Sequence, residues 1–129
     1  MAQVVVYGLR RILGPVRAHL SETIHSCLVE ALSLPMEKRF QRLVLLADDE
    51  FFAPADRTER YTIIEISMFS GQSVATKKRL LRLLSERLED EIGIGPADLE
   101  VTITETPREN WLIRGLPGDE LDLSYPLEP

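Results

Sequence analysis

Residues 61–104, YTIIEISMFSGQSVATKKRLLRLLSERLEDEIGIGPADLEVTIT, decide the fold class. The run 61–66 is rich in β-branched residues, which is typical of a buried strand. Ser73 is a favourable helix N-cap, and the leucines after it recur every three or four residues until Gly93 ends the pattern. Residues 99–104 then alternate apolar and polar side chains, as a strand does. The stretch therefore predicts a β-α-β unit.

The first half of the chain repeats this order. Residues 3–7, QVVVY, predict a strand that ends at Gly8. A helix is expected from Pro15 to about Leu32, before Pro35, and an apolar strand over 40–46. The sequence thus predicts one domain over 1–129. It consists of two β-α-β halves, about 2–47 and 61–105, followed by a tail over 106–129.

The two predicted helices cover only one face of the sheet. Right-handed crossovers place both on the same side of four strands. The strands nevertheless carry apolar side chains on both faces, as in 4–6, 43–46 and 63–64. A second copy of the chain is the natural cover for the other face, so the sequence predicts an obligate oligomer.

Composition excludes several classes of function. Among 129 residues there are 15 Lys and Arg against 21 Asp and Glu, a net charge of −6 that argues against nucleic-acid binding. The single cysteine, Cys27, excludes an internal disulfide and fits a reducing compartment. No signal peptide or membrane-spanning run is expected, so we predict a cytoplasmic protein without a membrane partner. His19 and His25 do not share a helix face, and no nucleotide-binding motif is present, which predicts neither metal nor cofactor.

The order of these elements resembles the tautomerase superfamily, and most closely its branch around malonate semialdehyde decarboxylase. The resemblance covers nearly the whole chain. It implies an α+β fold: a tandem β-α-β repeat with a four-stranded sheet and two helices on one face, assembled as a homotrimer with the sheets inward. It is carried by the strand at the amino terminus, by LVEALSLP (28–35), RFQ (39–41), KKRL (77–80), EIGI (91–94) and PADL (96–99), and by Trp111.

The departures from this family concern its chemistry. The family's catalytic N-terminal proline falls on Ala2, so removal of Met1 would leave a primary amine with an ordinary pKa of about 7.7–8.0. Burial lowers the pKa of such an amine, which would then act as a base or form a Schiff base. The decarboxylase's aspartate falls on Lys38, and its paired arginines fall within the uncharged stretch 69–72. Malonate semialdehyde decarboxylase activity is therefore not expected. The stretches 57–61 and 76–80, and Trp111 with Arg114-Gly115, also resemble uncharacterised bacterial proteins of this superfamily that lack the catalytic proline.

Several arginines are candidates to hold a substrate carboxylate, because guanidinium offers a bidentate fork. For Arg10 and Arg11 a solvated loop charge is the alternative, and for Arg57 a surface ion pair with Asp56 or Glu59. Trp111 is either a ligand contact or the anchor of the tail. The substrate-binding candidates are Arg10, Arg11, Arg39, Arg57, Arg114 and Trp111.

Two functional hypotheses follow. In the first, the protein is a cofactor-free catalyst of keto–enol proton transfer on a small carboxylate, with the Ala2 amine as base. In the second, it is a catalytically inactive trimeric binding or scaffold protein. The loss of proline, aspartate and paired arginines motivates the second hypothesis, while the strand that opens the chain favours the first.

Overall fold

The computed structural model describes residues 1–121 and contains a four-stranded mixed sheet in the order β2-β1-β3-β4. The strands are β1 (Ala2–Leu9), β2 (Gln41–Leu46), β3 (Thr62–Phe69) and β4 (Leu99–Thr106). β1 pairs with β2, and β3 with β4, in parallel, while β1 and β3 pair antiparallel at the centre. This confirms the two predicted β-α-β connections.

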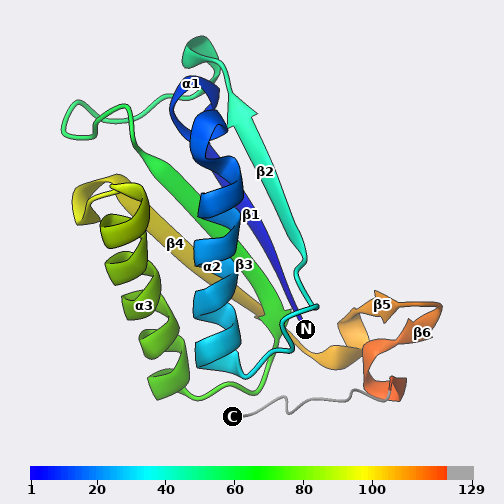
Figure 1. The fold of residues 1–129 in the computed structure, drawn as a ribbon. Coiled ribbons are helices and arrows are strands. Elements are labelled where there is room, and N and C mark those ends of the chain that lie inside the picture. Colours follow the sequence, from blue (N-terminus) through cyan, green and yellow to red (C-terminus); the bar gives the residue numbers. More distant parts are fainter. Residues whose placement is uncertain (122–129) are drawn as a thin grey trace.

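Both long helices, α2 (Arg17–Leu32) and α3 (Val74–Ile92), lie on the same face of the sheet, as predicted (Figure 1). The predicted start of α2 at Pro15 was early, because Gly14–Val16 form a 3₁₀ turn after the short helix α1 (Arg10–Leu13). At α3, Ser73 Oγ accepts a hydrogen bond from the Thr76 backbone N–H at 3.1 Å. In the described part of the chain, no helix is long and apolar enough to cross a membrane.

The core lies between these helices and the sheet. Leu80, Leu84 and Leu88 of α3 are fully buried and pack in the same cluster as Val6 and Ile64 from the two central strands. The spacing of the leucines places them on one stripe, which is why they reach the sheet together. Cys27 is buried in the same cluster. Burial raises the pKa of its thiol, which keeps the thiol protonated and unreactive.

Gly8 has a different role from the one predicted. Instead of ending the first strand it lies within β1, which continues to Leu9. A Cβ atom at this position would lie 2.2 Å from Leu13 Cδ1. Gly8 therefore allows the side chain of Leu13, which is 2% exposed, to close one end of the core.

The other face of the sheet is not covered within one chain. Val5, Tyr7 and Ile63 are half-buried on this face, and Val44 is 37% exposed. This confirms the prediction that apolar residues occupy both faces. Polar groups also lie there: the Tyr7 hydroxyl donates a hydrogen bond to Glu65, which raises the pKa of that phenol.

The tail contains a small hairpin that the sequence did not predict. Its strands are β5 (Leu112–Ile113) and β6 (Leu116–Pro117), and it stands beside the main sheet near the amino terminus (Figure 1). The end of the predicted tail, residues 122–129, lies outside the described residues.

Candidate functional site

A cavity of about 330 Å³ opens where the main sheet, the chain before β2 and the hairpin meet. This volume is at the lower end of the range for small-molecule sites. Val4 of β1 pairs with Gln41 of β2. Met1 and Lys38 each lie three residues before this pair, and both line the cavity. Its lining residues are Met1, Gln3, Lys38, Phe40, Leu112, Ile113 and Arg114.

The cavity is electropositive. Lys38 and Arg114 contribute two cations, and none of the lining residues carries a carboxylate. Within residues 1–121, no ion pair or hydrogen bond engages either side chain. Phe40, Leu112 and Ile113 supply apolar walls. The cavity thus fits a small anion that carries some apolar surface.

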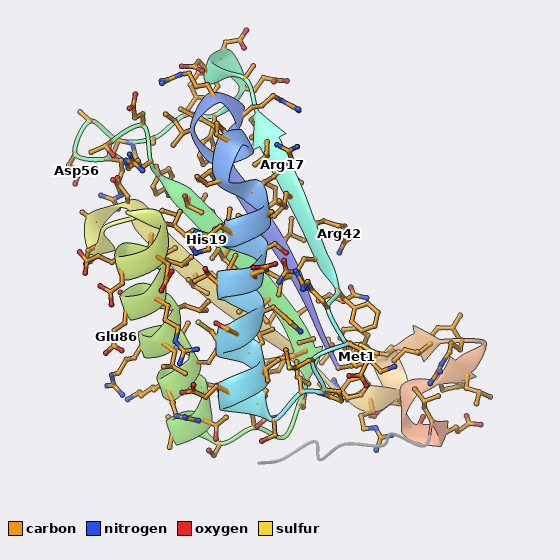
Figure 2. The ribbon with its side chains drawn as sticks, viewed as in Figure 1. Met1, Arg17, His19, Arg42, Asp56 and Glu86 are labelled. Carbon is orange, nitrogen blue, oxygen red and sulfur yellow. The ribbon has the colours of Figure 1, made fainter. Side chains whose placement is uncertain are left out.

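The N-terminal amine belongs to Met1, which lines this cavity and directly precedes β1 (Figure 2). Burial, and secondarily the positive charge of Arg108, lower the pKa of the Met1 amine from 8.0 to about 6. The Met1 carbonyl accepts a hydrogen bond from the Phe69 backbone N–H at 3.3 Å. Near neutral pH this amine is therefore mostly neutral and able to accept a proton.

Arg114 reaches the cavity through an unusual turn. It connects β5 and β6 together with Gly115, and the two residues have φ values of +50° and +85°. Two positive φ values fit a type I′ hairpin turn, in which Asn, Asp or Gly is the usual first residue. Arginine at such a position is uncommon, and strain of this kind often accompanies a functional role.

Contacts with the ends of β3 and β4 hold the hairpin in place. The Trp111 indole N–H donates to Thr106 Oγ1 at 2.8 Å, and its ring packs edge-on against Phe69, with 5.1 Å between ring centres. The Trp111 carbonyl accepts a hydrogen bond from the Gly118 N–H at 2.8 Å. Trp111 is thus engaged within the tail, and it positions the segment that carries Arg114.

Gly118→Ala is expected to displace this hairpin without unfolding the core. A Cβ atom at Gly118 would lie 2.4 Å from the Arg108 carbonyl oxygen and 3.2 Å from Trp111 Cβ. We expect a loss of about 1–3 kcal/mol in the free energy of unfolding and a red shift in fluorescence from Trp111, the single tryptophan. Gly95→Ala is the control, because nothing lies within 4 Å of its added Cβ. Unchanged fluorescence in Gly118→Ala would contradict this packing.

The lowered pKa of the amine also predicts a pH dependence of stability. In the chain that retains Met1, the unfolded amine binds a proton below pH 8.0 but the folded one only below about 6. The free energy of unfolding should therefore rise as the pH increases from 6 to 8. Urea unfolding of native and N-terminally acetylated protein at both pH values measures this. Equal pH dependence in the two samples would contradict the lowered pKa.

The structure brings only some of the predicted site residues together. Arg114 lines the cavity, and Ala2, 4% exposed at the start of β1, follows the residue that bears the amine. Arg10 donates to the Leu45 carbonyl at 2.9 Å, and Arg11 pairs with Asp48 and Glu59 at 2.8 and 2.9 Å. Both lie past the carboxyl end of β1, away from the cavity of the same chain.

The other two arginines also lie elsewhere. Arg39 donates to Ser21 Oγ at 3.3 Å and borders a separate cavity beside α2. His25, buried at that second cavity, has Nε2 2.7 Å from the Met36 carbonyl oxygen.

Arg57 belongs to a filled cluster at the start of β3. It pairs with Asp56 at 2.9 Å, lies 3.7 Å from Glu100, and sits over the ring of Tyr61 at 5.7 Å. The Tyr61 hydroxyl donates to Glu100, and its ring stacks on Phe51 with 5.4 Å between ring centres.

Sequence reasoning missed two cations. Lys38 was noted only as the position of the family's aspartate, although that correspondence was itself a signal that it borders the site. Arg108 follows Pro107 with no recognisable motif, so no local signal identified it. Among residues 1–121, no group of three His, Cys, Asp or Glu side chains lies close enough to hold a metal ion.

Comparison with known proteins places this geometry in a family. A family model described as "Tautomerase enzyme" matches residues 38–114, more than half of the chain, so the chain belongs to the tautomerase family. The probable tautomerase YusQ of Bacillus subtilis (strain 168) is 26% identical over 97 residues, 71% of this chain and 76% of YusQ. The 2-hydroxymuconate tautomerase of Pseudomonas putida is 37% identical over 57 residues, 44% of this chain and 90% of that protein.

Solved structures confirm the resemblance in fold. FG41 malonate semialdehyde decarboxylase inhibited by 3-bromopropiolate has a TM-score of 0.76 and 25% identity, covering 84% of this chain and 86% of that one. The R7 fused 4-OT wild type asymmetric trimer has a TM-score of 0.80 at 19% identity, covering 92% and 97%. The second likeness shows the fold alone.

Proposed function

We propose that this chain catalyses cofactor-independent keto–enol proton transfer on a small carboxylate substrate. The observation that best supports this is the cavity at the start of β1, where the Met1 amine, with a pKa of about 6, lies beside Lys38 and Arg114, two cations that no residue in 1–121 pairs. A neutral amine accepts a proton near neutral pH, and the cations attract a carboxylate. Membership of the tautomerase family supports the same reaction class.

In this proposal the Ala2 amine, exposed by removal of Met1, is the base. It takes the proton of the enol hydroxyl, and the resulting ammonium returns a proton to carbon, so the substrate isomerises with no net change in protonation. Lys38 and Arg114 hold the carboxylate and stabilise the negative charge of the enolate. Met1 is one wall of the cavity, so its removal would enlarge the space in front of the new amine.

We also propose that the protein is a homotrimer that acts in the cytoplasm. The half-buried apolar residues on the open sheet face need cover, and a solved relative with the same fold is described as a trimer. Arg10, Arg11, Arg39 and Arg57 remain proposed substrate contacts, directed in the trimer to an adjacent subunit's cavity. The buried, unpaired Cys27 agrees with a reducing compartment.

The expected mass in solution is three times the 14.6 kDa of one chain. Light scattering coupled to size exclusion measures it directly. Tyr7→Glu, which would place a second carboxylate beside Glu65 on the open sheet face, is expected to shift the protein toward monomer because burial of two like charges opposes association. A wild-type protein that elutes as a monodisperse monomer would contradict the trimer.

The test of the activity begins with the intact mass of protein expressed without an N-terminal tag. If Met1 is absent, ketonisation of 2-hydroxymuconate and of simple enol-pyruvates is followed by ultraviolet absorbance. Saturable turnover would support the proposal. No turnover of any of these enols, by wild type or by Ala2→Pro, would reject it.

A second candidate function is an inactive binding or scaffold protein. It is favoured by one observation: the side chain of Met1 itself lines the cavity. A chain that retains Met1 would keep that wall and present no Ala2 amine. Intact mass that includes Met1, together with calorimetric binding of 2-hydroxymuconate without turnover, would establish this alternative.

A further inference from the structure

Arg108 connects the C-terminal segment to the amino-terminal end of β1. Its Nε donates to the Gly118 carbonyl at 3.0 Å and its Nη2 to the Leu121 carbonyl at 2.8 Å. These two bonds tie the residues that follow the hairpin to the residues that precede it. The centre of the guanidinium lies 5.6 Å from the centre of the Phe69 ring, a distance typical of a cation–π contact. The side chain is therefore fixed from three directions.

Phe69, beneath Arg108, is also the strand neighbour of the amino terminus. Its backbone N–H donates to the Met1 carbonyl, whose carbon is bonded to the nitrogen of Ala2. Ala2 in turn pairs with Met68 in the antiparallel register of β1 and β3. Through Phe69, Arg108 is thus connected to the segment that contains both the Met1 amine and the backbone nitrogen of Ala2, which becomes the amine when Met1 is removed.

We propose that Arg108 is a positioning residue that orders the Arg114 hairpin and holds a fixed positive charge near the N-terminal amine. The inference rests on the proposed function, in which that amine is the base and Arg114 holds the carboxylate. Arg108 does not line the cavity, so it acts through these two groups and not by contact with substrate.

The charges around the amine support this assignment. Lys38 and Arg114 line the cavity on one side. On the helix side, Glu105, which pairs with Met68, lies 2.6 Å from Lys77 of α3, so the two charges compensate. Burial is the larger cause of the lowered pKa of the amine, and Arg108 is the charged group that lowers it further. A nearby cation has this effect because it disfavours a second positive charge.

The experiment measures the protonation of the amine directly. The rate of N-terminal acetylation is followed from pH 5 to 9 by mass spectrometry of the N-terminal peptide, with circular dichroism to check folding. Three variants are compared with wild type: Arg108→Gln removes the charge, Arg108→Lys keeps it, and Trp111→Phe loosens the hairpin but leaves the charge in place. KM and kcat for ketonisation of the substrate are measured on the same four proteins without acetylation.

The pH midpoint of N-terminal acetylation should distinguish an effect of the Arg108 charge from an effect of the hairpin's structure. We expect Arg108→Gln to raise it by less than half of the way from the wild-type midpoint to 8.0, the ordinary value for an N-terminal amine, because burial remains. Arg108→Lys and Trp111→Phe should keep the wild-type midpoint, while Trp111→Phe and Arg108→Gln both raise KM several-fold. A wild-type midpoint in Arg108→Gln would overturn the inference, as would an equal rise in Trp111→Phe.

Acetylation requires no turnover, so the two proposals fail in different ways. A raised midpoint in Arg108→Gln with no ketonisation by any variant would reject the proposed function but support the effect of Arg108 on the amine. Turnover by wild type with equal midpoints in all variants would support the function and reject the role of Arg108.

Discussion

Acetylation of the N-terminal amine is expected to abolish ketonisation, because an amide nitrogen cannot accept the substrate proton. Selective reaction is feasible near pH 7, because burial at the start of β1 lowers the pKa of an N-terminal amine, as it does for the Met1 amine, whereas lysines with pKa values of about 10.4 remain protonated. Initial rates before and after modification measure the effect, and peptide mass analysis verifies that Lys38 is unmodified.

Ala2→Pro is the matched control for this prediction. It replaces the primary amine by a secondary amine whose ring fixes the direction of the nitrogen, so activity should be retained or increased. Acetylation should inactivate this variant as well. Full activity of an acetylated sample would show that the amine is not the base.

Removal of both cations from the cavity should give the second largest effect. Lys38→Gln with Arg114→Gln deletes two charge-assisted hydrogen bonds to the substrate, each worth about 1.5–3 kcal/mol. We therefore expect kcat/KM to fall by roughly 100-fold or more, mainly through KM. Steady-state kinetics at fixed ionic strength measure the loss.

A double variant of equal charge change provides the control. Lys78→Gln with Arg82→Gln removes two cations from α3, outside the cavity lining. It should leave kcat/KM near the wild-type value. An equal loss in both double variants would assign the effect to the overall field of the protein, and no loss in the first would show that the cavity does not hold the carboxylate.

The fold was predictable because its core obeys simple periodicity. Leu80, Leu84 and Leu88 recur every four residues, and this spacing alone places them on the buried face of α3. Ser73 and Gly93 marked the ends of that helix, since a capping hydroxyl and a residue at positive φ are local requirements. Such signals depend on near neighbours in sequence, so one chain is enough to read them.

The site was less predictable because its parts come from distant segments. Lys38 reaches Met1 through the register of two parallel strands, and Arg114 through a turn whose arginine departs from the usual turn residues. The role of Gly8 was predicted wrongly for a similar reason. A glycine is needed there because the side chain of Leu13 comes close, and only the folded structure displays that contact. Ala2 was identified through family resemblance and Arg114 as an arginine beside Trp111, and the roles of both stay predictions.

The cluster of Arg57, Tyr61 and Glu100 has a consequence for stoichiometry. The chain has two β-α-β units but only one amino terminus, and the leading strand of the second unit begins in mid-chain at Thr62. At that place Tyr61, Phe51 and Arg57 fill the space with stacked rings and ion pairs. Each subunit would therefore contribute a single reactive amine. A trimer would contain six β-α-β units but would react with three equivalents of an amine-directed inhibitor, not six.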